Sequence, residues 1–133
     1  MLFGAEHVKR YIETGGREGH EWAGAHVLIL TTTGRRTGEL RSTPVIYRRR
    51  GDQYVVVASR AGADEHPAWY LNLRAAPRVQ VQVLGDSFAA DARTATPEEK
   101  AELWPSMTQV WPDYDRYQAQ TRRDIPVVIL APV

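Results

Sequence analysis

Residues 59–73, SRAGADEHPAWYLNL, join a loop that must bend sharply to a helix. Gly62 stands between two small residues and lets backbone N–H groups approach a flat or anionic ligand. Pro67 stands where a helix would begin. Trp69 and Asn72 then share one helix face through i, i+3 spacing, and a buried amide must find hydrogen-bond partners. The segment therefore predicts a strand-to-helix junction that holds a ligand.

A second unusual stretch lies upstream at residues 31–38, TTTGRRTG. Arginine forks and backbone donors at a tight, Gly-bounded turn suit a phosphate group. We interpret Arg35, Arg36 and Arg41 as candidates for anion binding, the alternative being a solvated hairpin with scattered arginines. The net charge of the chain is only +1, so an anion site must be local. The other arginine run, residues 48–50, is expected to lie in a solvated turn.

Composition describes a single globular domain and excludes several kinds of chemistry. Hydrophobic residues make up 43% of the 133 residues and charged residues 25%, unlike a disordered chain. The absence of cysteine excludes disulfides, thiol catalysis and thiolate metal sites, and the four histidines share no metal-ligand spacing. Charged residues interrupt the start where a signal peptide needs an apolar run, and no stretch approaches the ~20 apolar residues of a membrane span. We expect a cytoplasmic protein without a metal or nucleic-acid site.

Short apolar runs between turn residues predict about six strands. Gly51-Asp52 and Gly85-Asp86 mark hairpins, and Pro44 predicts an edge or a bulge in its strand. Mostly hairpin-linked, antiparallel strands with peripheral helices favour an α+β, mainly β small barrel over a βαβ repeat. The predicted strands are 26–32, 40–49, 53–59, 79–83, 87–94 and 125–130.

Helix signals occur at both ends of the chain. Residues 1–25 are expected to form a helix and loop, the helix ending at Gly15, ahead of a barrel domain at 26–133. Residues 96–99, TPEE, form a capping box with proline at the first helical position. Pro105 is expected to kink or split that helix.

Trp111, Tyr114 and Tyr117 form an aromatic ladder with a spacing of three. Such a ladder is usually packing. Large aromatics in a polar helical setting also suit a wall for a flat electron acceptor, which the tyrosine hydroxyls would orient or protonate. Both interpretations stay open from the residues alone.

Together, in this order along the chain, these stretches resemble the deazaflavin-dependent nitroreductase and quinone reductase family, whose members use coenzyme F420. The resemblance runs from about His26 to Pro132 and includes the Trp104-Pro105 pair, residues 111–114 and residues 124–128. It implies an FMN-binding-like split β-barrel, a bound deazaflavin, and hydride transfer from reduced F420 to a quinone, a nitroaromatic or another activated unsaturated acceptor.

The resemblance also implies roles for individual residues. Ser59, Tyr114 and Tyr117 are expected to be catalytic, and Trp111 to contact the acceptor together with both tyrosines. Trp111 stands where the family often has tyrosine, which affects the expected acceptor preference. The expected cofactor-binding residues are Arg35, Arg36, Thr37, Arg41, Pro44, Ser59, Arg60, Ala61, Gly62, Ala68, Trp69 and Asn72.

Two alternatives to a deazaflavin reductase stay open. The same barrel architecture hosts FMN, whose phosphate would also suit an arginine-rich turn. A non-catalytic module that stores the deazaflavin would need the same binding residues. The expected partner is a small-molecule acceptor and the expected state a monomer or a homodimer, with no transmembrane segment and with association at a membrane surface left open.

Overall fold

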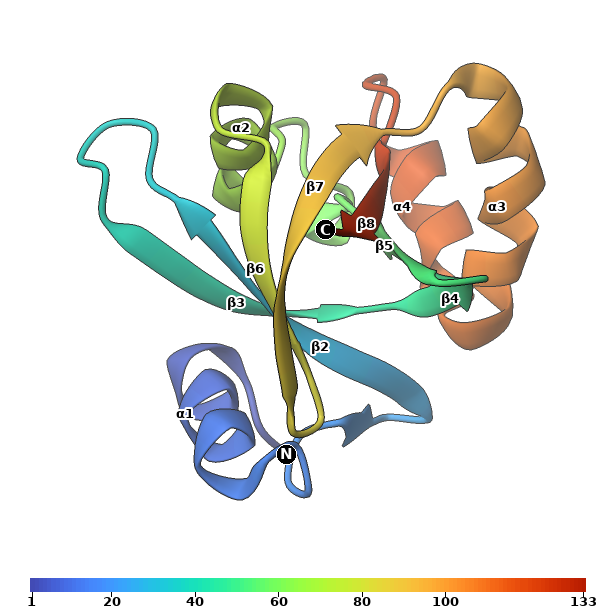
Figure 1. Ribbon diagram of the computed structural model, residues 1–133. Coiled ribbons are helices and arrows are strands. Elements are labelled where there is room, and N and C mark those ends of the chain that lie inside the picture. The colour runs from blue at the N-terminus through green and yellow to red at the C-terminus, as the bar shows by residue number, and fades with distance from the viewer.

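The computed structural model describes residues 1–133 and shows a curled, antiparallel β-sheet with helices around it (Figure 1). Hydrogen bonding gives the strand order β1-β2-β6-β7-β8-β5-β4, with β3 paired to β2. The α+β, mainly β prediction is confirmed, with two strands more than expected because β1 and β4 span only two and three residues. The strands are β1 Glu21–Trp22, β2 Ala25–Thr33, β3 Leu40–Ile46, β4 Arg48–Arg50, β5 Gln53–Val57, β6 Arg78–Val83, β7 Asp86–Thr94 and β8 Val127–Pro132.

The sheet closes on itself where the predicted strand 40–49 bends. Its first part, β3, pairs with β2, its second part, β4, pairs with β5, and only Tyr47 separates the two. Pro44 of β3 lies opposite Ile29 of β2. On its other side β3 pairs with no strand. An edge position lets proline join a sheet without losing a ladder bond, so the expected edge is confirmed.

The arginine run at 48–50 is not a solvated turn, because it forms β4 under helix α3. Nη1 of Arg50 lies 3.0 Å from Oε2 of Glu99. Nη1 of Arg48 donates to the carbonyl oxygen of Ser106 at 3.1 Å. Charge-based sequence reasoning could not foresee that a helix far along the chain supplies these partners.

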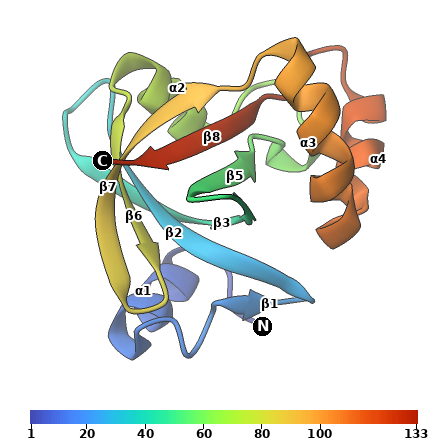
Figure 2. The same cartoon turned by 45° about the vertical axis from the view of Figure 1, so that its right-hand side comes forward.

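Two apolar clusters lie on opposite faces of β5 and β8. Tyr54 and Val56 belong to the cluster of 14 buried residues inside the barrel, whereas Val55 and Val57 belong to a cluster of eight beneath α3 and α4. Successive side chains of a strand point to opposite faces, so a strand covered on both faces is apolar throughout. Figure 2 shows α3 and α4 beside β8 and β5.

The helices follow local capping signals closely. α1 ends at Gly15, whose φ of 61° is left-handed as expected of a C-cap, and the capping box between Thr96 and Glu99 is present. Pro105 does not split α3, which continues through it. No helix is long and apolar enough to cross a membrane. The helices are α1 Gly4–Thr14, α2 Ala68–Ala75, α3 Pro97–Val110 and α4 Asp113–Gln120, with a 3-10 turn, η1, at Arg60–Gly62.

The N-terminal segment packs onto the barrel. Tyr11 of α1 is fully buried, and its hydroxyl accepts a hydrogen bond of 2.8 Å from the backbone N–H of Leu84 in the β6–β7 hairpin. β1 pairs with β2 before the expected boundary after residue 25. The segment and the barrel therefore share one sheet, which brings residues from the start of the chain to the site described next.

Candidate cofactor and acceptor site

Two adjoining hollows meet between β3 and α2. The first, here called the aromatic cavity, has a volume of about 450 Å³ and a mainly hydrophobic lining. The second, the arginine groove, has a volume of about 370 Å³. Thr43 and Trp69 line both, so the two hollows are neighbours. The residues that line the groove are Gly34, Arg35, Arg36, Thr37, Arg41, Thr43, Ala68, Trp69 and Asn72.

Asn72 fixes the position of Arg35 in the groove. Its side chain is only 4% exposed, and its Oδ1 accepts hydrogen bonds from the backbone N–H of Arg35 at 3.2 Å and from Nη1 of Arg35 at 3.1 Å. Its Nδ2 donates to Oγ1 of the buried Thr32 at 3.2 Å. The partners that a buried amide needs are thus protein groups, and Arg35 is held in place before any ligand binds.

The other groove arginines are held more loosely. The Arg41 side chain is 63% exposed, and its Nη2 lies 3.3 Å from Oε2 of Glu39. The loop itself is closed by a hydrogen bond of 2.7 Å from the backbone N–H of Gly34 to the carbonyl oxygen of Glu39. Arg36 is exposed beside it. The groove therefore presents one oriented and two adaptable guanidinium groups to solvent.

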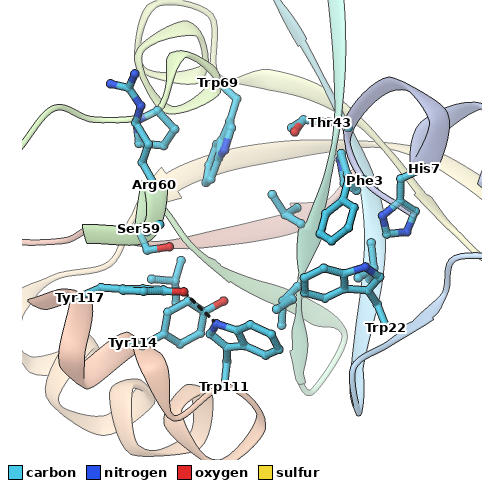
Figure 3. A pocket seen from close by; sticks show the side chains of 18 of the residues that line it. Phe3, His7, Trp22, Thr43, Ser59, Arg60, Trp69, Trp111, Tyr114 and Tyr117 are labelled. Carbon is cyan, nitrogen blue, oxygen red and sulfur yellow. Dashed lines mark hydrogen bonds between the residues drawn. The ribbon is translucent and has the colours of Figure 1, made fainter. Parts of the chain in front are cut away.

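The α4 side of the aromatic cavity carries the predicted ladder. Figure 3 shows Trp111, Tyr114 and Tyr117 together along one side, although Trp111 has non-helical backbone and precedes α4. Nε1 of Trp111 donates to the hydroxyl of Tyr117 at 3.5 Å, a long hydrogen bond. Burial raises the pKa of Tyr114, and the neighbouring Tyr117 raises it further. The Tyr114 hydroxyl therefore stays protonated at neutral pH, and it makes no hydrogen bond to the protein.

The loop after β5 forms another wall of the cavity. Arg60 and Ala61 have φ values of 45° and 51°, which are strained for residues with a side chain. Ser59 and both of these residues line the cavity. The Arg60 guanidinium points away from the cavity (Figure 3) and lies 3.4 Å from Oε2 of Glu65.

Gly62 is the one expected cofactor residue that lines neither hollow. Its φ is 80°, and a Cβ there would lie 2.9 Å from Cα of Tyr117. The close approach of η1 to α4 explains why the turn needs glycine at this position. The other expected site residues line one hollow or both. Those that line the cavity are Pro44, Ser59, Arg60, Ala61, Trp69, Trp111, Tyr114 and Tyr117. Those that line the groove are Arg35, Arg36, Thr37, Arg41, Ala68, Trp69 and Asn72.

The N-terminal segment supplies a wall that the sequence did not reveal. Figure 3 shows Phe3, His7 and Trp22 across the cavity from the tyrosines. The ring centroids of Trp22 and Trp111 are 5.3 Å apart, and Nε1 of Trp22 donates to the carbonyl oxygen of Leu2 at 2.8 Å. Large aromatics in an otherwise polar segment were the only available signal. The cavity residues missed by sequence reasoning are Leu2, Phe3, Gly4, His7, Trp22, Val27, Thr43, Val45, Ile46, Val57 and Pro67.

Comparison with known proteins identifies the family of this chain. Residues 4–132 match the family described as F420H(2)-dependent quinone reductase. The chain is a member of that family. An F420H(2)-dependent quinone reductase of Mycobacterium tuberculosis is 40% identical over 128 residues, which cover 93% of this chain and 86% of the relative.

Solved structures agree with this family membership. One described as an F420-H2 dependent reductase has 35% identity and a TM-score of 0.72, covering 78% of this chain and 92% of its own. Another, described as a domain-swapped dimer, has 33% identity and a TM-score of 0.75, covering 94% of each chain. The predicted split β-barrel and the predicted F420-dependent reductase class are therefore confirmed, and the storage-module alternative is not supported.

Coenzyme F420 is the cofactor of the F420H(2)-dependent quinone reductase family, and the two hollows fit it. A deazaflavin coenzyme carries a phosphodiester and a glutamate tail, and the groove offers three guanidinium groups for that negative charge. The flat ring needs an apolar hollow with few polar groups, as the aromatic cavity provides. The FMN alternative has no support from the family match.

Proposed function

We propose that the protein catalyses hydride transfer from reduced F420 to a quinone, with the coenzyme lying across both hollows. The supporting observation is that a cationic groove and an aromatic cavity share Thr43 and Trp69, so one ligand with an anionic tail and a flat ring can fill both. When bound, the reduced coenzyme supplies the hydride. The protein supplies binding, orientation and electrostatics.

Arg35, Arg36 and Arg41 bind the anionic tail, with Thr37 beside them. Because Nη1 of Arg35 already donates to Oδ1 of Asn72, ordering that side chain costs little on binding. Asn72 acts mainly through Arg35, since both its amide oxygen and its amide nitrogen have protein partners.

The ring is placed by residues around the junction of the two hollows. Ser59, Arg60 and Ala61 line the cavity on one side and Trp69 on another. Pro44 and Ala68 complete this part of the lining. Gly62 contributes indirectly, by allowing η1 to pack against α4.

Tyr114 and Tyr117 act on the acceptor. Hydride addition to a quinone builds negative charge on its oxygens, and positioned phenols can donate hydrogen bonds to that charge as it develops. The Tyr114 hydroxyl has no competing protein partner, and the Tyr117 hydroxyl has only the long contact from Trp111. The Ser59 hydroxyl is the third candidate donor at the cavity.

The family description favours a quinone as acceptor. A nitroaromatic has the same flat shape and also accumulates negative charge on oxygen, so the same donors would serve it. The cytoplasmic location, the association with a membrane surface and the state as monomer or homodimer remain predictions from the sequence.

Steady-state oxidation of reduced F420 tests the proposal. The coenzyme is mixed with the protein and with a quinone, a nitroaromatic or no acceptor, and its absorbance is followed. We expect oxidation that depends on protein and is fastest with the quinone. Binding of F420 without any acceptor-dependent oxidation would contradict the proposal.

A further inference from the structure

Arg123 lies in the loop between α4 and β8 and binds residues 58–66 from outside the cavity. Its Nε donates to the carbonyl oxygen of Ala63 at 2.7 Å, and its Nη2 donates to that of Ser59 at 2.6 Å. Its Nη1 donates to the carbonyl oxygen of Ala58 at 3.2 Å and to Nδ1 of His66 at 3.1 Å. One guanidinium thus joins both ends of the loop that lines the cavity.

We propose that Arg123 is a positioning residue that holds residues 59–61 against the coenzyme ring. Arg123 lines neither the cavity nor the groove, so it acts through the loop and not by contact with a ligand. This inference rests on the proposed function, because it assumes that the cavity holds the ring.

The loop needs such a restraint because its backbone is strained. Arg60, Ala61 and Gly62 follow one another with positive φ values of 45°, 51° and 80°. Non-glycine residues keep this conformation only where the surrounding structure holds them there. Strain of this kind next to a ligand cavity is typical of functional loops.

Neighbours of Arg123 hold the same loop. Nε2 of Gln120 donates to the carbonyl oxygen of Ala61 at 3.2 Å, and Oγ1 of Thr121 donates to Oδ1 of Asp64 at 2.8 Å. Arg123 makes more hydrogen bonds to the loop than either of them, and of the three side chains only Arg123 bonds to Ser59, a residue that lines the cavity. Loss of its guanidinium should therefore release the wall at the ring.

The test compares Arg123→Met with Arg122→Met. Methionine keeps much of the length of arginine and removes every donor. Arg122 is the adjacent arginine, is exposed and makes no hydrogen bond, so it controls for the loss of one positive charge from the same loop. Arg123→Lys keeps the charge but offers donors from a single nitrogen.

The first readout uses the protein without coenzyme. Amide hydrogen exchange of residues 58–66 should be about 10-fold faster or more in Arg123→Met than in Arg122→Met, since a restraint on local opening is lost. Exchange of residues 35–41 should be unchanged. Equal exchange of residues 58–66 in the two variants would overturn the proposal whatever the cofactor proves to be.

The second readout separates turnover from binding. Per bound F420, Arg123→Met should turn over about 10- to 100-fold more slowly than Arg122→Met, because small misplacements are costly in catalysis. The Kd for F420 should change less than about 3-fold, because the arginine groove is untouched. The turnover rate of Arg123→Lys should lie between those of Arg123→Met and Arg122→Met. If Arg123→Met does not fold, the comparison of Arg123→Lys with Arg122→Met tests the positioning role.

The outcomes separate this inference from the proposed function. Faster exchange with unchanged turnover would make Arg123 a purely structural residue and overturn its role in positioning. A wild-type protein that binds no F420 or oxidises none of its reduced form would instead overturn the proposed function. The exchange result would still decide whether Arg123 holds the loop.

Discussion

Replacing Arg35 with alanine should weaken F420 binding more than replacing either of the other groove arginines. Both arginines are exposed, but the Arg35 guanidinium is already oriented by the buried Asn72, whereas the ion-pair partner of Arg41 is the exposed Glu39. A hydrogen bond to a charged group contributes about 1.5–3 kcal/mol, and each 1.4 kcal/mol is about tenfold in Kd. We expect the Kd to rise roughly 10- to 150-fold in Arg35→Ala.

The Arg41→Ala change should cost much less. Exposed ion pairs contribute about 0–1 kcal/mol, which corresponds to at most about a 5-fold rise in Kd. The stability of Arg35→Ala should stay close to that of the wild type, because the backbone N–H of residue 35 still donates to Oδ1 of Asn72 at 3.2 Å. The melting temperature therefore separates lost binding from lost folding.

Fluorescence titration with F420 at several salt concentrations measures both the affinity and its electrostatic part. Salt screens exposed charges, so the Kd of Arg35→Ala should depend less on salt than that of the wild type. Arg78→Ala serves as the control, because Arg78 is an exposed arginine paired with Asp91 and lines neither hollow. A Kd for Arg35→Ala within about 3-fold of the Arg78→Ala value would refute the assignment of the groove to the anionic tail.

Three further outcomes follow from the site and its loop. Tyr114→Phe should lower kcat with a quinone by ~10-fold or more if its hydroxyl stabilises the transition state by at least about 1.4 kcal/mol. The control Tyr54→Phe removes a hydroxyl outside both hollows and should keep kcat near the wild-type value. Burial, Arg123 and Arg74 lower the pKa of His66 in the folded state, so the unfolded chain binds more protons as the pH falls below about 6.5 and the free energy of unfolding should decrease there. Chemical denaturation at pH 5 and pH 7 measures this decrease, which should be smaller in His66→Gln. Gly62→Ala should lower the free energy of unfolding by about 1–3 kcal/mol more than Gly38→Ala. Both glycines have positive φ, but an added Cβ meets close atoms only at Gly62. Equal losses of stability in thermal unfolding would argue against tight packing of η1 on α4.

Local signals in the sequence predicted much of the fold. The alternation in β6, the Gly51-Asp52 hairpin and the capping box of α3 each depend on a few neighbouring residues, and the structure has all three. The second hairpin also forms, but its turn is Leu84-Gly85 and not the predicted Gly85-Asp86, because Asp86 already pairs with Val83 as the first residue of β7. The bend at Tyr47 could not be predicted. The run 40–49 looks like one strand, and its division depends on which strands pair with each half.

The candidate site likewise has residues that the sequence predicted and residues that it did not. Arg35, Trp69 and Tyr114 stand in distinctive stretches and line the two hollows as expected. Trp22 was missed because its place in the cavity depends on how the N-terminal segment packs against the barrel. Arg123 was missed because its partners are mainly backbone carbonyl oxygens, which every residue has and which no sequence pattern marks.

A crystal structure of the protein with bound F420 tests the central claim most directly. The account predicts the phosphodiester and glutamate tail in the arginine groove, with tail oxygens within hydrogen-bond distance of Arg35. It also predicts the deazaflavin ring in the aromatic cavity, between Trp69 and residues 59–61, with the hydroxyls of Tyr114 and Tyr117 facing the space left for the acceptor. A ring bound in the groove, or a coenzyme bound away from both hollows, would contradict it.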